Sequence, residues 1–236
     1  MTKDRSQTPA KPSSKPEIAA FLDKVKALGP AVTAGKRGRL VFALDATMSR
    51  QPTWDAACAL QADMFHEAAS VGGLDIQLVY FRGLNECRAS GWVAASARLG
   101  ELMGRIQCVG GHTQIGKVLA QARQEHGRER VQALVFVGDA MEEKLDELCA
   151  AAGELGLLGV PVFLFQEGND PVAETAFREI ARLSRGAYCR FDTGAAQQLR
   201  ELLRAVAAYA AGGRKALAEL SSRGAGGARL LLAQMK

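Results

Sequence analysis

Residues 40–49 read LVFALDATMS, and this stretch decides how the rest of the chain is interpreted. The apolar run Leu40–Leu44 has the length of a buried strand and ends abruptly in Asp45. Thr47 and Ser49 follow at steps of two. Open α/β sheets bind their ligands at the carboxyl ends of the strands, and carboxylate and hydroxyl oxygens suit a hard divalent cation. The segment therefore predicts a metal site at the edge of a sheet.

Strand and helix patterns alternate along the chain on the carboxyl side of this segment. Near-continuous apolar runs, which are typical of buried parallel strands, recur at 131–137 and 160–165, and a shorter run lies at 187–191. Residues 75–81 and 86–90 flank a Gly-Leu-Asn turn and predict an antiparallel hairpin at the sheet edge. We therefore expect an α/β fold, a Rossmann-like doubly wound sheet that is mostly parallel and has one antiparallel edge strand.

Helical spacing of apolar residues separates the expected strands. Helices are predicted over 53–71, around 115–122 and 145–152, after the cap signal Asp170-Pro171, and around 199–206. The run Glu142-Glu143-Lys144 is typical of a solvated helix start. One more helix is expected to hold Trp92, Leu99, Leu102, Met103 and Ile106.

The charge divides the chain into three parts. Residues 1–37 form a basic, disordered segment with a short helix from Glu17 to Leu28, residues 38–211 form the α/β domain, and residues 212–236 form a basic, partly helical, mobile tail. The net charge is +6 over 1–39, −5 over 40–211 and +4 over 212–236. Apart from Phe21, no aromatic residue stands among the basic residues of the ends, which argues against nucleic acid as the partner.

Apolar stretches and cysteines indicate the compartment. No stretch has the length of a membrane span, and residues 2–16 are polar rather than signal-like, so we expect no membrane association. The five cysteines are scattered and form no CxxC pair, which argues for a reducing cytoplasm and against a disulfide framework or a zinc site.

Two later loops hold further candidate ligands. Thr113 follows Gly110-Gly111 just before a helix, and Asp139 directly follows an apolar strand. If the strands are parallel and adjacent, all three loops lie on the same edge of the sheet. Two carboxylates balance a divalent charge, and three hydroxyls add oxygen ligands without charge. Mg²⁺ prefers six oxygens and usually keeps some waters, so we expect at least one position to be open to a carboxylate of a partner.

At these residues the chain resembles the von Willebrand factor A (VWA) domain family, and more narrowly its bacterial intracellular type. The metal-ion-dependent adhesion site (MIDAS) of that family reads D-x-S-x-S, followed by a Thr in a later loop and an Asp after a fourth strand. Asp45, Thr47, Ser49, Thr113 and Asp139 match these positions, and the resemblance covers about residues 38–211. The departure is Thr47, which keeps the hydroxyl of the family's Ser but adds a methyl group and a stiffer χ1.

The resemblance implies a Mg²⁺ or Mn²⁺ site in which the hydroxyls bind directly and one or both acids act through water. It also implies a non-enzymatic interaction domain that docks an Asp or Glu of a partner protein on the metal. Bacterial intracellular members often serve larger assemblies, including ATPase or chaperone complexes. Residues expected on the rim that meets the partner are Met48, Arg50, His112, Met141 and Glu142.

Other functions stay open. Gly111–Lys117 fits G-x-x-x-x-G-K, so a nucleotide-binding or phosphate-processing enzyme that uses this loop and Asp139 is an alternative. Against it, Val118 stands where a P-loop needs Ser or Thr, and the preceding segment is a poor strand. An aspartyl phosphatase would need an acid where Thr47 stands. A third alternative is a metal-independent scaffold that docks through another surface, such as the basic ends.

Overall fold

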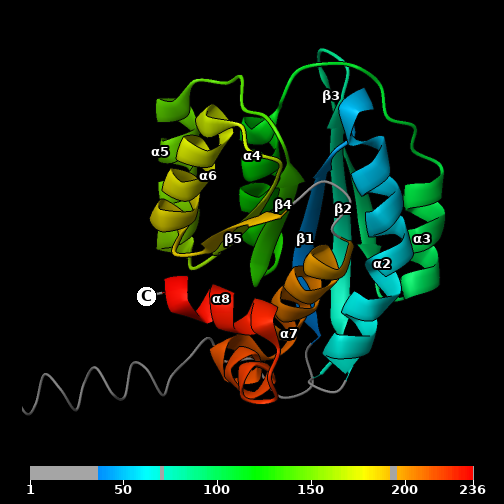
Figure 1. The fold of residues 1–236 in the computed structure, drawn as a ribbon, viewed down its shortest axis with the longest axis vertical. Coiled ribbons are helices and arrows are strands. Elements are labelled where there is room, and N and C mark those ends of the chain that lie inside the picture. The colour runs from blue at the N-terminus through cyan, green and yellow to red at the C-terminus, as the bar shows by residue number, and fades with distance from the viewer. Residues whose placement is uncertain (1–36, 70–71, 192–195, 236) are drawn as a thin grey trace, which may run out of the picture. The chain divides into compact units, whose positions relative to one another are not determined.

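A six-stranded sheet forms the centre of the computed structural model, which describes residues 37–69, 72–191 and 196–235 (Figure 1). The strand order is β3-β2-β1-β4-β5-β6, and every neighbouring pair is parallel except β2 with β3. The predicted fold class is therefore confirmed. The strands are β1 (Gly38–Asp45), β2 (Leu74–Arg82), β3 (Glu86–Val93), β4 (Ala133–Gly138), β5 (Val162–Glu167) and β6 (Ala187–Phe191).

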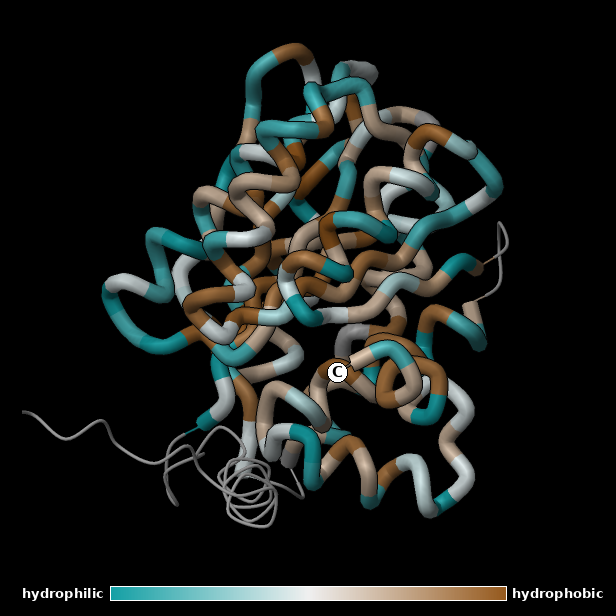
Figure 2. Tube along the Cα trace, turned by 90° about the vertical axis from the view of Figure 1, so that its left-hand side faces the viewer, coloured by the Kyte–Doolittle hydropathy of each residue, from teal (hydrophilic) through white to brown (hydrophobic). Residues whose placement is uncertain are grey.

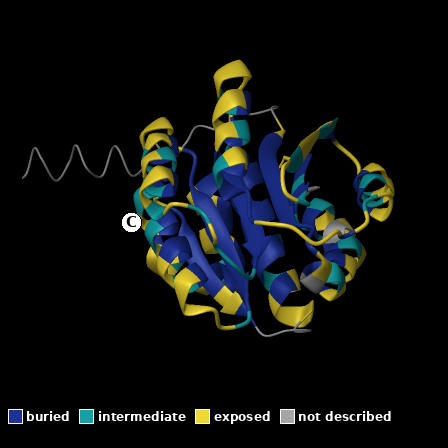
Figure 3. Cartoon of the chain, turned by 90° about the horizontal axis from the view of Figure 1, so that it is seen from above, coloured by how far each residue is buried: buried dark blue, intermediate teal, exposed yellow. Residues whose placement is uncertain are grey.

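Helices cover both faces of the sheet. Those described are the short η1 (Met48–Arg50) and α2 (Gln51–Ala69), α3 (Ser96–Gly104), α4 (Ile115–Arg128), α5 (Leu145–Leu158), α6 (Pro171–Ser184), α7 (Ala196–Ser222) and α8 (Gly226–Gln234). Phe42 and Leu44 of β1 share a hydrophobic cluster with α2, α3, α7 and α8, whereas Val41 and Ala43 share one with α4, α5 and α6. This alternation follows from the two-residue period of a strand. Hydrophobic segments accordingly gather in the interior (Figure 2), and the central strands are buried (Figure 3).

The parallel register of β1 and β4 positions the expected metal site. Leu44 of β1 lies opposite Val137 of β4, so Asp45 and Asp139 leave the sheet at the same edge. The loop that carries Thr113 reaches this edge through backbone hydrogen bonds, from Val109 N–H to the Ala46 carbonyl oxygen at 2.9 Å and from His112 N–H to the Gly83 carbonyl oxygen at 3.1 Å. The three loops therefore meet as expected.

The edge hairpin is present, but β3 is longer than expected. Its turn begins at Gly83, whose φ of 60° lies in the left-handed region that glycine adopts without strain. We expected Trp92 in a helix, and that expectation is wrong. After a register shift, the antiparallel pairing resumes with Gln77 opposite Trp92, so β3 continues to Val93. The helix α3 begins only at Ser96, and Ile106 lies beyond its end.

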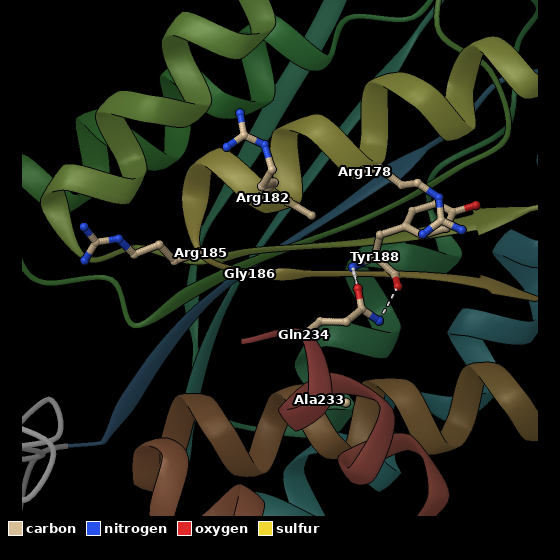
Figure 4. A pocket seen from close by; sticks show the side chains of 8 residues that line it. Arg178, Arg182, Arg185, Gly186, Tyr188, Ala233 and Gln234 are labelled. Atoms are coloured by element: carbon tan, nitrogen blue, oxygen red, sulfur yellow. Dashed lines mark hydrogen bonds between the residues drawn. The ribbon is translucent and has the colours of Figure 1, made fainter. Parts of the chain in front are cut away.

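The C-terminal segment is packed against the domain, which corrects the expectation of a mobile tail. The helix α7 kinks at Gly213 (φ 67°, ψ −162°) and continues, and Leu217, Leu231 and Met235 are buried. The side-chain oxygen of Gln234 accepts a hydrogen bond of 2.9 Å from the Tyr188 amide, and its side-chain nitrogen donates one of 2.8 Å to the Tyr188 carbonyl (Figure 4). The side chain of Gln234 thus pairs both backbone hydrogen-bonding groups of Tyr188 on the edge strand β6.

Two further expectations concern the termini and the cysteines. The helix expected from Glu17 to Leu28 lies outside the described residues. All five cysteines are free. Of the helices that the structure describes, none combines the length and the apolar character needed to cross a membrane.

Candidate metal centre

Asp45 is the last residue of β1 and is only 3% exposed. Its Oδ1 accepts a hydrogen bond of 2.8 Å from the backbone N–H of Thr47, and the Thr47 hydroxyl also bonds the carboxylate. Burial raises the pKa of Asp45 to about 6, and the neighbouring charge of Asp139 adds to the rise, while the bonds from Thr47 and the charge of Arg50 oppose it. The ionised form of this carboxylate is therefore unfavourable in its buried surroundings, and a bound cation would stabilise it.

Thr113 is buried and held by two reciprocal hydrogen bonds. Its Oγ1 accepts one of 3.0 Å from the backbone N–H of Glu142, and its own N–H donates one of 3.1 Å to Oε2 of Glu142. These bonds join the loop before α4 to the loop after β4. Since a hydroxyl oxygen has two lone pairs, Thr113 can accept this bond and still bind a cation.

Four of the five predicted ligands line one cavity of about 230 Å³ at the carboxyl edge of the sheet, namely Asp45, Thr47, Thr113 and Asp139. Ser49 belongs to η1, but its side chain lies outside the described part of the structure. Two carboxylates and two hydroxyls fit a hard divalent cation. Within 37–69, 72–191 and 196–235, no group of three or more His, Cys, Asp or Glu side chains is placed to hold a metal.

The similarity of this chain to known proteins lies in its fold. No protein-family model matches the chain, and no curated protein matches its sequence. Solved structures do match. A von Willebrand factor type A protein from Catenulispora acidiphila superimposes with a TM-score of 0.59 and 20% identity, over 75% of this chain and 43% of that one. The SpRpn10 VWA domain gives 0.56 and 10% identity, over 70% of this chain and 95% of that one. The chain has the VWA fold.

A third match has a metal at its MIDAS. Proximal thread matrix protein 1 from the mussel byssus, in a structure with a zinc-occupied MIDAS motif, superimposes on the VWA fold of this chain with a TM-score of 0.57 and 18% identity. The match covers 81% of this chain and 51% of that one. The chain thus spans about half of the byssus protein and less than half of the Catenulispora protein.

Some of the residues expected on the rim of the candidate centre lie there, and others do not. Met48 is 63% exposed and lines the cavity together with Glu142, whose Oε2 lies 3.0 Å from Nδ1 of the exposed His112. Met141 is half-buried and packs against the core on the side of α4 to α6. Arg50 does not lie on the rim, because it is only 3% exposed and forms an ion pair.

Two exposed apolar side chains near the centre were not expected. Leu84 of the β2–β3 turn is 77% exposed, and Val109 of the loop before α4 is 43% exposed. The two segments are joined by the hydrogen bond between His112 and Gly83. The sequence signal was present, since Leu84 and Val109 are apolar residues that stand next to a glycine in a loop, but only the fold places both loops beside the cavity.

The ion pair of Arg50 is the main feature that the sequence analysis missed. Arg50 Nη1 contacts Oε2 of Glu167, the last residue of β5, and the Thr53 hydroxyl donates a hydrogen bond to the same oxygen. The same Nη1 lies 3.8 Å from Oδ2 of Asp139. A carboxylate at the end of an apolar strand was the available signal. Its proximity to Arg50 follows only from β5 lying next to β4.

Glu143 also differs from expectation. Instead of starting a solvated helix, it lies before α5 and its carboxylate accepts hydrogen bonds from the N–H groups of Ile115 at 2.5 Å and Gly116 at 2.9 Å. These N–H groups begin α4 and have no acceptor within their own helix. Glu143 therefore caps the helix that follows Thr113, and a negative charge suits that end of the helix dipole.

The alternative phosphate loop does not have the surroundings of a P-loop. In the described chain between β3 and α4 there is the helix α3 and a loop, but no strand. The Lys117 ammonium lies 3.3 Å from the Asn85 carbonyl oxygen and 2.9 Å from the side-chain oxygen of Gln114. A P-loop connects a strand directly to a helix. Lys117 here links α4 to the hairpin turn instead.

Proposed function

We propose that this chain is a divalent-cation-dependent protein-interaction domain and not an enzyme. In this proposal Asp45, Thr47, Thr113 and Asp139, together with Ser49, hold the cation, and an Asp or Glu of a partner protein completes its coordination. The observation that carries the proposal is that three loops, widely separated in the sequence, bring two carboxylates and two hydroxyls to one cavity. The VWA fold supports it.

The proposed cation is Mg²⁺ or Mn²⁺. All candidate donors are oxygens, and hard cations prefer oxygen ligands, whereas sites selective for zinc normally contain nitrogen or sulfur. The byssus protein nevertheless has zinc at its MIDAS, so any test has to compare the three ions.

The proposed partner presents its acidic residue among apolar ones. Met48, Leu84 and Val109 are exposed near the cavity, and apolar side chains on the partner would bury their surface. Coordination of the cation would then fix the orientation of the partner, and the apolar contacts would provide most of the buried surface of the interface. A component of an ATPase or chaperone complex, in a bacterial cytoplasm, is the proposed biological setting.

Calorimetric titration of the metal-free protein with Mg²⁺, Mn²⁺ and Zn²⁺ tests the cation site. We expect one ion per chain and a loss of binding of about a hundredfold or more in Asp45→Asn, because a neutral amide replaces a charged ligand. Asp63→Asn is the matched control, since it removes a carboxylate that pairs with Arg200 outside the cavity. Equal binding by wild type and Asp45→Asn would reject the site.

Water-proton relaxation with bound Mn²⁺ tests the open position. We expect the relaxation enhancement to fall when acetate is added, because a carboxylate displaces a water ligand from the ion. Partner capture should then require the cation and should be lost in EDTA and in Asp45→Asn. Capture that persists in EDTA would favour the metal-independent scaffold, and nucleotide binding that disappears in Lys117→Ala would favour the enzyme.

A further inference from the structure

A buried ion pair lies beside the proposed cation centre. Arg50 and Glu167 are 3% and 5% exposed, and they come from the segments that follow β1 and end β5. Glu167 also accepts a hydrogen bond from the hydroxyl of the buried Thr53. Burial of two charges is costly unless they pair closely. The two charges therefore form a close, buried ion pair at this edge of the sheet and not a surface salt bridge.

The guanidinium of Arg50 serves more than one carboxylate. Besides its bond to Glu167, Nη1 lies 3.8 Å from Oδ2 of Asp139, one of the proposed cation ligands. Arg50 Nε is buried and has no hydrogen-bond partner among the described residues. An arginine has five N–H donors in a fixed fork, so Arg50 retains donor capacity that a second carboxylate can use.

The space for such a contact is present. Arg50, Asp139 and Glu167 line a second cavity of about 360 Å³, adjacent to the first because Asp139 and Ala140 line both. Arg50 places a positive charge 3.8 Å from Oδ2 of Asp139. A divalent ion that binds Asp139 has to share this carboxylate with the guanidinium and is repelled by its charge.

We propose that Arg50 is a built-in competitor of the divalent ion for Asp139, and that Glu167 sets the strength of this competition by holding the guanidinium. This inference rests on the proposed function, because it concerns the same centre. Arg50 and Glu167 are positioning residues that act through Asp139. The pair determines how tightly the centre binds its ion. It therefore also sets the concentration of free divalent ion at which the centre is occupied and can bind a partner.

The test measures Mn²⁺ and Mg²⁺ affinity by calorimetry on the whole chain. Glu167→Gln leaves the guanidinium without its charged partner, so Arg50 turns to Asp139 and we expect about tenfold weaker cation binding. The double variant Arg50→Met with Glu167→Met replaces the pair by apolar side chains, a change that buried ion pairs often tolerate. It removes the competitor, and we expect binding about threefold tighter than in wild type.

The matched control is Glu125→Gln. Glu125 pairs with the buried Arg39 near the other end of β1, at 3.5 Å, so its loss disturbs a similar pair far from Asp45 in the strand. Stability should fall and cation affinity should stay unchanged. Circular dichroism verifies that each variant is folded. If Glu167→Gln does not fold, the double variant still decides, because a purely structural role for the pair predicts no tightening.

The outcomes are distinct. Weaker binding in Glu167→Gln and tighter binding in the double variant support the competition. Wild-type affinity in both variants, or a loss in Glu125→Gln as large as in Glu167→Gln, overturns it and leaves the proposed function intact. Absence of cation binding by the wild-type protein overturns the proposed function and this inference with it.

Discussion

Gly111 lies directly against the backbone of Gly83. A Cβ atom on Gly111 would stand 2.0 Å from the Gly83 carbonyl oxygen, a distance that no side chain can occupy. The same oxygen accepts the hydrogen bond of 3.1 Å from His112. The contact fixes the loop that carries Thr113 onto the hairpin turn, so the position of this proposed ligand depends on the absence of a side chain at position 111.

Gly111→Ala should therefore weaken cation binding by about tenfold and lower the free energy of unfolding by about 1–3 kcal/mol, because the loop has to move away from the turn. Gly110→Ala is the control one residue away, since a Cβ on Gly110 meets nothing within 4 Å. Calorimetry and urea unfolding measure both effects. Similar affinities in the two variants would show that the Gly83 contact does not position the loop.

The buried Asp45 carboxyl predicts a pH dependence of stability in the metal-free protein. Its pKa in the folded chain is about 6, above its ordinary value of 3.8, so the folded state binds the proton more tightly than the unfolded state. The free energy of unfolding should therefore fall as pH rises from about 4 to about 6, by about 3 kcal/mol for this group, and stay low above that range.

Asp45→Asn removes this dependence. In EDTA at pH 8 we expect the variant to be more stable than wild type by up to about 3 kcal/mol, and at pH 4 we expect the two to be equally stable. Urea unfolding at both pH values measures the difference, with Asp63→Asn, at a half-buried carboxylate outside the cavity, as the control. A variant less stable than wild type at pH 8 would contradict the destabilising role of the ionised carboxylate.

Thr47 can be tested with two substitutions that separate its hydroxyl from its methyl group. Thr47→Val keeps the shape and removes an oxygen ligand and its bond to Asp45, so cation binding should weaken by about tenfold or more. Thr47→Ser keeps the oxygen and should bind within about threefold of wild type. Titration calorimetry with Mn²⁺ measures both, and equal losses in the two variants would assign the effect to packing of the methyl group.

Glu143 should contribute to stability as the cap of α4. Glu143→Ala leaves the N–H groups of Ile115 and Gly116 without their acceptor, so the free energy of unfolding should fall by about 1–2 kcal/mol. Glu147→Ala, which removes a carboxylate from an exposed ion pair with Lys144, should change it by less than about 0.5 kcal/mol. Thermal or urea unfolding distinguishes the two, and equal effects would argue against the cap.

Local pattern was sufficient for most of the fold. The apolar strands, the hairpin turn at Gly83 and the Asp170 cap, whose side chain accepts a hydrogen bond of 2.7 Å from Ala173, were predictable because each depends on residues close in sequence. Trp92 was misplaced because the periodicity of a short apolar pattern does not by itself distinguish a strand from a helix. The packed C-terminal segment was missed because its glycines and charges conceal the few buried positions, such as Leu217 and Leu231.

The sequence by itself determined which side chains are candidate ligands of a cation, since Asp45, Thr47, Thr113 and Asp139 stand next to strand and loop signals that can be read locally. Only the tertiary structure decided what surrounds them. Arg50 and Glu167 are 117 positions apart, and their pairing follows from the order of the parallel strands. Local pattern encodes the period of an element and its ends, whereas the electrostatic environment of a carboxylate depends on neighbours that only the packed chain brings together.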